Sequence, residues 1–354
     1  MNRMVMALAV PVLAIVMVAI TLSGPPEPLP AVFLPEDCRR IGVVDRRDRP
    51  LVGIEDLEIL PSGEVIFTAY NRRYRERPAR GIYRISIEEM VYGEPPFAEE
   101  IGGIERSVER LYPHGMSIDL QTGRLAFVNR REPDDAEVVW GTLRPNGFDM
   151  EGRWSGGGSC RANDVLWRGN DLFVTLDRES CGFSIGDLIP GAATGKLLRV
   201  GYGGAETVAE GLEFPNGLVV LDNKLYVAET RGGTLRDMVD GEIIELPGGP
   251  DNITRGPVGT IVVAMHPDLT DYWLYTLDFT EGSGTRIMRL DPRRADDRTI
   301  LFDDPIGKTF KGGTVAAFSR GTMIAGSAYD EGMLMCSQIF QNLPPRPGQE
   351  NNTG

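Results

Sequence analysis

The chain has 354 residues, 42% of them hydrophobic and 25% charged, a composition typical of a globular protein that can bury a large core. Its formal net charge of −14 argues against nucleic-acid binding, because a protein that neutralises phosphates needs a basic face. The chain shows no clear linker in its middle, which favours one large repeat domain over two domains.

An apolar segment stands at the N-terminus. Residues 4–22 follow Arg3 and contain no charge. A stretch of about 20 apolar residues can span a bilayer as a helix. No small-residue cleavage site precedes Pro25, so we favour an uncleaved signal-anchor in residues 1–23 over a cleaved signal peptide. Both alternatives place the remaining chain outside the cytoplasm, and the anchor would make the membrane a partner through this segment.

Three further regions follow the apolar segment. The proline-rich residues 24–37 predict a stiff stalk, and residues 38–342 form the expected domain. Residues 343–354 are polar and proline-rich, which predicts a disordered tail without an assigned function.

Pairs of apolar runs separated by turns recur through the domain. Their second runs are rich in β-branched or aromatic residues, as in β-hairpins. The six predicted hairpins span residues 57–69, 116–128, 165–176, 218–228, 253–264 and 315–326. Further predicted strands lie between them at 82–87, 138–143, 196–200, 242–246 and 286–290. No amphipathic helix is expected to interrupt them. The pattern predicts an all-β, six-bladed β-propeller preceded by an N-terminal hydrophobic helix.

Polar residues recur just before the predicted inner strands. In a propeller these strands run along the central channel, so their first residues surround one mouth of it. The pairs at this point are Glu55-Asp56, His114-Gly115, Asn163-Asp164, Asn216-Gly217, Asp251-Asn252 and Gly313-Thr314. Any one of them is most simply a turn residue, but recurrence in phase indicates a shared site.

The oxygen donors of this ring point to calcium. The ring members that could bind a metal ion are Glu55, Asn163, Asn216, Asp251 and Asn252. Calcium takes six to eight oxygen ligands at flexible angles, whereas zinc prefers nitrogen or sulfur. The neighbouring Asp56 and Asp164 are expected to point away from the mouth into the core, where a second, internal calcium ion would pair with them.

The chain has four cysteines: Cys38, Cys160, Cys181 and Cys336. An even number in an exported protein suggests disulfides, with three pairings possible. A Cys38–Cys336 bond would tie the two ends of the domain together. Cys160 and Cys181 flank the third predicted inner hairpin, which suggests an extra disulfide near the channel mouth.

Several segments resemble the paraoxonase and arylesterase family, in the same order and over nearly the whole domain. They are GIEDLEILPSG, PHGMSI, LAFVNR, CRANDVLW, AEGLEFPNGLVV, LYVAET, PDNI and VVAMHP. The resemblance implies a six-bladed propeller with two calcium ions, an anchor-like N-terminal segment and one disulfide, here Cys38–Cys336. It assigns the catalytic calcium to the five ring residues above. It assigns the structural calcium to Asp56, Asp164 and the backbone carbonyl of Met116.

The only two histidines of the chain fall on family positions. The resemblance implies that His114 is the general base and that His266 lines the substrate pocket, together with Phe214, Arg130 and Asp177. Arg130 is a departure, because the family usually has a second histidine there to support the base. An arginine cannot accept a proton from an imidazole and would lower its basicity.

These features predict a carboxylic ester hydrolase for small-molecule lactones or aryl esters. Calcium would polarise the carbonyl and stabilise the oxyanion while His114 takes a proton from water. No G-x-S-x-G motif is present, which argues against a serine acyl-enzyme. One alternative is a calcium-stabilised propeller that binds a ligand or protein without catalysis. Another is a gluconolactonase-like or strictosidine-synthase-like propeller, which shares the PNG and PDN motifs. No obligate protein partner is expected.

Overall fold

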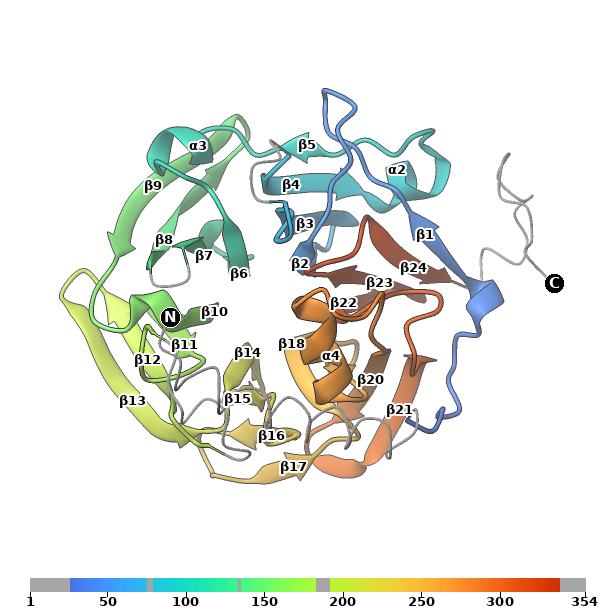
Figure 1. The fold of residues 1–354 in the computed structure, drawn as a ribbon. Helices are drawn as coiled ribbons and strands as arrows, with labels where there is room; N and C mark the ends of the chain where they lie inside the picture. The colour runs from blue at the N-terminus through green and yellow to red at the C-terminus, as the bar shows by residue number, and fades with distance from the viewer. Residues whose placement is uncertain (1–25, 75–78, 133–134, 183–191, 338–354) are drawn as a thin grey trace, which may run out of the picture.

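The computed structural model describes residues 26–74, 79–132, 135–182 and 192–337. Within these ranges, 24 strands form six four-stranded sheets arranged as blades around a central axis (Figure 1). This arrangement confirms the predicted all-β, six-bladed propeller. The predicted N-terminal helix and C-terminal tail lie outside the described residues.

Each of the first five blades is built from four consecutive strands, numbered outwards from the channel. Blades 1 and 2 contain β2 (Ile54–Ile59), β3 (Glu64–Ala69), β4 (Gly81–Ser86), β5 (Glu99–Glu100), β6 (Pro113–Asp119), β7 (Arg124–Glu132), β8 (Asp135–Arg144) and β9 (Gly147–Trp154). Blades 3 and 4 contain β10 (Ala162–Arg168), β11 (Asp171–Leu176), β12 (Gly195–Gly201), β13 (Gly204–Leu212), β14 (Pro215–Leu221), β15 (Lys224–Glu229), β16 (Thr234–Asp237) and β17 (Ile243–Glu245). Blade 5 contains β18 (Gly249–Arg255), β19 (Ile261–His266), β20 (Thr285–Asp291) and β21 (Arg294–Asp304).

The sixth blade combines both ends of the domain. It contains β22 (Gly313–Ser319), β23 (Thr322–Ser327) and β24 (Met333–Ser337), and β1 (Cys38–Ile41) adds to β24 as its outermost strand. Cys38 lies opposite Cys336 in this antiparallel pair, and the two form a disulfide. The ring is therefore closed by strand pairing and by a covalent bond, which restricts the unfolded chain.

A second disulfide joins Cys160 to Cys181 in blade 3. Both predicted pairings are thus present. Two disulfides are typical of a protein from an oxidising compartment outside the cytoplasm. None of the helices in the described residues has the length and apolar content needed to cross a bilayer. The predicted anchor, residues 4–22, falls outside those residues.

Short helical segments interrupt the strands, which the sequence did not lead us to expect. They are η1 (Pro35–Asp37), α2 (Ile87–Tyr92), α3 (Ile104–Ser107), η2 (Ser159–Arg161) and α4 (Leu269–Thr276). α4 begins after Asp268, whose carboxylate accepts hydrogen bonds from the backbone N–H groups of Thr270 and Asp271. At eight residues it is too short to show an apolar period clearly.

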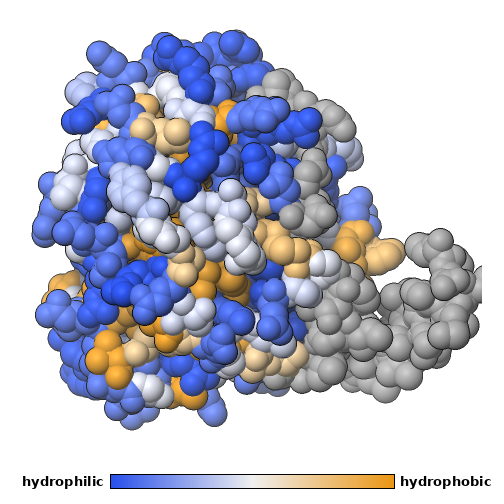
Figure 2. Space-filling model, turned by 90° about the vertical axis from the view of Figure 1, so that its left-hand side faces the viewer, coloured by the Kyte–Doolittle hydropathy of each residue, from blue (hydrophilic) through white to orange (hydrophobic). Residues whose placement is uncertain are grey.

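The hydrophobic core lies in layers between neighbouring blades. Val128 of blade 2 and Val165 of blade 3 belong to one buried cluster, and Leu57 of blade 1 and Val315 of blade 6 belong to another. Hydrophilic side chains predominate on the outer side of the ring shown in Figure 2, with hydrophobic ones interspersed. Because the apolar residues pack between the blades, the channel can hold polar ones.

The inner strands share an irregularity at their first residues. In each, the register shifts near the start of the pairing with the next strand, as between Ile54 and Leu57 in blade 1. The polar pairs were expected before the strands, but they lie inside them, at these bulges. A bulge leaves residues unpaired in the ladder and redirects their side chains. In blades 1 to 5 each bulge holds two residues, which we call the first and second positions.

Candidate functional site

The first positions form a buried set at one end of the innermost strands. Their side chains come from five blades and are at most 8% exposed: Glu55, His114, Asn163, Asn216 and Asp251. The second positions are Asp56, Gly115, Asp164, Gly217 and Asn252. The repeat therefore places five polar side chains at equivalent points of the ring.

Carboxylates and amides of the bulge residues meet across blades. The Nδ2 atom of Asn252 donates to Glu55 Oε1 at 3.1 Å and to the backbone oxygen of Glu55 at 3.0 Å. The Nδ2 atom of Asn216 donates to Asp251 Oδ1 at 2.6 Å. All three bonds use amide nitrogens and so leave the amide oxygens available.

Four buried oxygens of the bulge residues, three at first positions and one at a second position, have no hydrogen-bond partner among the described residues. They are Glu55 Oε2 and the Oδ1 atoms of Asn163, Asn216 and Asn252. Leaving a buried acceptor unsatisfied costs about 1–3 kcal/mol, so four at equivalent bulges of the inner strands call for a partner. A hard cation that accepts carboxylate and amide oxygens would be such a partner.

The donor set therefore fits calcium better than a transition metal. Within the described ranges, no three His, Cys, Asp or Glu side chains group together as a metal-binding cluster. The set instead depends on amide oxygens, which calcium accepts and zinc does not favour. Burial raises the pKa of Glu55 to about 7, while Arg72 opposes this shift and Asp251 adds to it. A cation at Glu55 would compensate the cost of burying its charge.

The acidic second positions are bonded differently. Asp56 accepts from the backbone N–H groups of Leu57 at 2.9 Å and Met116 at 2.6 Å. Asp164 accepts from those of Val165 at 2.7 Å and Leu218 at 2.8 Å. Each carboxylate thus joins its own blade to the next one, and none of its oxygens is left without a partner.

The second predicted calcium has less support from this geometry. Met116 presents its N–H group to Asp56, so the role of its carbonyl as a ligand stays a prediction. Burial raises the pKa of both Asp56 and Asp164 well above the ordinary value, and repulsion from Asp164 and Glu55 adds to the shift at Asp56. The two acids favour a nearby cation electrostatically, although backbone groups already satisfy their oxygens.

His114 lies between a carboxylate and a guanidinium. Its Nδ1 atom is 2.8 Å from Nη2 of Arg72 and 3.4 Å from Oε2 of Glu55. An arginine can only donate, so Nδ1 is the acceptor and the proton of the neutral ring lies on Nε2. Burial holds the pKa of His114 well below its usual value, Arg130 and Arg72 lower it further, and the side chain of Asn163 opposes this shift.

Arg72 is a site residue that the sequence did not reveal. It follows β3, the strand paired with the one that carries Glu55, and its side chain is 9% exposed. It stands among several arginines with no motif to distinguish it. Only the strand register, in which Ala69 pairs with Ile54, could have placed it beside Glu55.

His266 is fully buried and belongs to the same blade as Asp251. Its Nε2 atom lies 2.9 Å from Asp251 Oδ2, and its Nδ1 atom is buried without a partner in the described part of the chain. Its ring stacks on Tyr272 of α4 with centroids 3.4 Å apart. These contacts fix the orientation of the imidazole next to Asp251, one of the first positions.

The remaining predicted substrate residues also lie at this end of the inner strands. Nη2 of Arg130 donates to Asp177 Oδ2 at 3.2 Å and to the backbone oxygen of Ala162 at 2.7 Å. Phe214 precedes β14 with a φ of 60°, and the guanidinium of Arg178 lies 5.8 Å from its ring centroid. The structure thus brings the predicted substrate-binding residues to the mouth that holds the oxygen donors.

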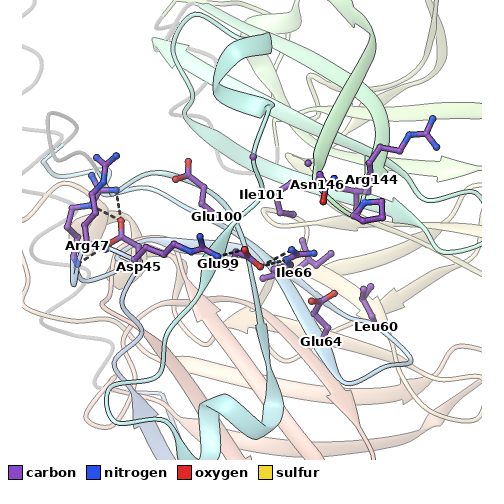
Figure 3. A pocket seen from close by; sticks show the side chains of 17 residues that line it. Asp45, Arg47, Leu60, Glu64, Ile66, Glu99, Glu100, Ile101, Arg144 and Asn146 are labelled. Carbon is purple, nitrogen blue, oxygen red and sulfur yellow. Dashed lines mark hydrogen bonds and ion pairs between the residues drawn. The ribbon is translucent and has the colours of Figure 1, made fainter.

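A separate pocket of about 710 Å³ lies on the outer edge of blades 1 and 2 (Figure 3). Arg84 donates to Glu99 at 2.8 Å, Arg46 pairs with the same carboxylate, and Arg144 is among the other lining residues. None of the predicted site residues lines this pocket. Arg46 and Arg84 pair with Glu99 and Arg49 pairs with Asp45, and we assign the pocket no role in the site.

No protein-family model matches the chain, and no curated protein matches it either. Solved structures do resemble it in fold. A candidate gluconolactonase shares 17% identity at a TM-score of 0.50, covering 88% of this chain and 94% of its own. A protein of unknown function from Bacteroides thetaiotaomicron shares 11% identity at a TM-score of 0.54, covering 85% of this chain and 75% of its own. These likenesses support the propeller fold alone, and the paraoxonase resemblance rests on the sequence motifs.

Proposed function

We propose that this protein is a calcium-dependent hydrolase of lactones or aryl esters. The observation that carries the proposal is the set of four buried oxygens without partners, contributed by Glu55 and three asparagines from blades 1, 3, 4 and 5. A calcium ion bound there would polarise a carbonyl group and stabilise the developing oxyanion. The five predicted ligands, completed by Asp251, would hold it.

The residues of the chain also limit where the water proton can go. In hydrolysis, water adds to the acyl carbon and loses a proton to a base, the bond to the leaving oxygen breaks, and that oxygen takes up a proton. Nε2 of His114 can take that proton only when the ring carries its own proton on Nδ1. In that tautomer Nδ1–H would face Glu55 Oε2, now 3.4 Å away, and Arg72 would have to give up its bond to Nδ1. A base role for His114 therefore requires Arg72 to move.

The same site can serve two alternative functions. The likeness to a candidate gluconolactonase, which covers 94% of that chain, makes aldonolactones a substrate class to include. A non-catalytic binding protein is favoured by Arg130, because its guanidinium is bonded to Asp177 and Ala162 where a histidine could have assisted a base.

A substrate panel tests the proposal directly. Simple lactones, an aldonolactone and phenyl acetate are incubated with the full chain, with and without a chelator, and with the variants His114→Gln and Asn163→Ala. We expect the chelator to abolish turnover, calcium to restore it and both variants to reduce it. The matched control is Asn170→Ala, an exposed amide at the opposite end of the same hairpin, which should keep wild-type turnover. Absence of turnover on every substrate would instead favour the binding protein.

A further inference from the structure

Arginine side chains stacked on aromatic rings surround the same mouth. Tyr70 and Arg72 directly follow β3, whose last residue pairs with the start of β2. The guanidinium of Arg72 lies 4.2 Å from the ring centroid of Tyr70, and that of Arg73 lies 4.5 Å from the centroid of Tyr275. Such stacking holds a guanidinium in place while its N–H edge stays available.

The stacks continue around the ring. Arg80, just before β4, lies 4.5 Å from the ring centroid of Tyr112, and Arg231, after β15, lies 5.3 Å from that of Phe214. These residues sit at strand ends on the side of the ring that carries the first positions. A protein with a net charge of −14 thus gathers guanidinium groups at one mouth of its channel.

Arg72 is the most buried of these arginines, and its side chain is bonded to two backbone carbonyls. Nη1 donates to the backbone oxygens of Gly53 at 3.3 Å and Ala328 at 3.1 Å. Nη2 makes one further hydrogen bond, to His114 Nδ1. A guanidinium has five N–H donors, so two remain without an acceptor in the described part of the chain. Two donors on one guanidinium can bind both oxygens of a carboxylate.

The charge of Arg72 is also less compensated than that of its neighbours. Arg73 is 3.1 Å from a carboxylate oxygen of Asp278, and Arg130 is 3.2 Å from one of Asp177. The carboxylate nearest Arg72 is that of Glu55, at 4.0 Å and without a hydrogen bond. A buried cation with unused donors gains most from an anion that enters the channel.

We propose that the mouth selects substrates that carry a carboxylate, with Arg72 as the residue that binds it. The substrate class is a lactone or ester with an acidic group close to the bond that is cleaved, and this rests on the proposed function. The other stacked arginines attract such an anion towards the channel. Arg72 is then a specificity residue, and a substrate without the carboxylate leaves its two donors unpaired.

A pair of γ-lactones with the same ring tests the proposal, one unsubstituted and one with a ring carboxylate. The ratio of their kcat/KM values is measured for the wild type, Arg72→Gln, Arg72→Lys and the control Arg320→Gln. Arg320 is an arginine of the β22–β23 turn, at the other end of the channel. We expect the wild type to prefer the carboxylated lactone by about 10- to 100-fold, the value of a charged hydrogen bond. Arg72→Gln should lose most of that preference, Arg72→Lys should keep part of it, and Arg320→Gln should keep all of it.

An equal loss of turnover on both lactones in Arg72→Gln would overturn the proposal, because a structural or general catalytic role would have that effect. A wild-type preference for the neutral lactone would overturn it even if the glutamine variant fails to fold. If neither lactone is hydrolysed, the proposed function fails and the carboxylate site is tested alone by calorimetric titration with cyclopentanecarboxylate. The carboxylate site would be supported if cyclopentanecarboxylate binds about tenfold more weakly to Arg72→Gln than to the wild type and cyclopentanol does not bind. Equal binding by wild type and variant would reject it.

Discussion

The first and second positions of the inner-strand bulges are adjacent in sequence but have different roles. At the first positions, Glu55 and two asparagines keep oxygens without partners in the described structure, and Asn252 adds another from a second position. At the second positions, Asp56 and Asp164 accept backbone N–H groups from their own blade and the next. In blades 1 and 3, one side chain of the bulge thus offers an oxygen to a bound cation. The other side chain connects neighbouring blades by hydrogen bonds. A change at Glu55 or Asn163 should therefore affect binding, and one at Asp56 or Asp164 should affect stability.

The largest effect is expected for Glu55→Gln. The amide keeps the shape of the side chain but removes one of the two carboxylates at the first positions, so calcium affinity and turnover should each fall by about 100- to 1000-fold. Calorimetric calcium titration and lactone hydrolysis measure the two effects. Glu64→Gln, at the far end of the same hairpin, is the matched control. Unchanged calcium binding in Glu55→Gln would remove Glu55 from the site.

Asp164→Ala tests the second positions. The change leaves the buried N–H groups of Val165 and Leu218 without an acceptor, so the free energy of unfolding should fall by about 3 kcal/mol. Urea denaturation measures this loss. The control is Asp171→Ala on the same hairpin, whose side chain is 52% exposed and which should change stability by about 0.5 kcal/mol at most. Equal stability of the two variants would contradict the role of Asp164 as a joint.

Gly217→Ala tests the other kind of second position, a glycine where blades approach closely. A Cβ atom there would lie 2.6 Å from the backbone nitrogen of Ile253 and 2.7 Å from Cα of Asn252. Forcing the strands apart should cost about 1–3 kcal/mol of stability and displace Asn252 from the site. Thermal unfolding and calcium titration should therefore both change. Gly201→Ala, where nothing lies within 4 Å of the added atom, should change neither.

A smaller effect concerns the pH dependence of stability in the absence of metal ions. The folded state raises the pKa of Asp56 and Asp164, so it favours their protonated forms. Stability should then be highest at low pH and fall as the pH rises above the ordinary carboxyl value of about 4. Denaturation in chelator from pH 5 to pH 8 measures the slope, which Asp164→Asn should reduce. An unchanged slope in Asp164→Asn would contradict the contribution assigned to Asp164.

The smallest change is the position of one proton on His114. The bond from Arg72 predicts the Nε2–H tautomer, and Arg72→Gln should allow the proton to move to Nδ1. Nitrogen-15 NMR can resolve this because the chain has only two histidines. The bond of His266 to Asp251 does not involve Arg72, so the His266 signals provide an internal control. Nδ1–H already present in the wild type would contradict the assignment.

Much of the fold and of the donor set could be predicted from the sequence. The hairpins followed from local turn residues and β-branched runs, and the ring of oxygen donors followed from their recurrence in phase with the hairpins. The structure does bring Asn252 to Glu55 and Asn216 to Asp251 across blades. The short helices were missed because caps such as Asp268 act over a single turn and leave no period in the sequence.

The sequence by itself determined which residue types recur, how many blades they imply and which side chains start the inner strands, because turns, β-propensity and repeat phase are local properties. The tertiary structure alone decided which atoms meet. It directed Asp56 to the N–H of Met116 and placed Arg72 against His114. Those contacts depend on bulge geometry and strand register between residues far apart in the chain, which local preference does not encode.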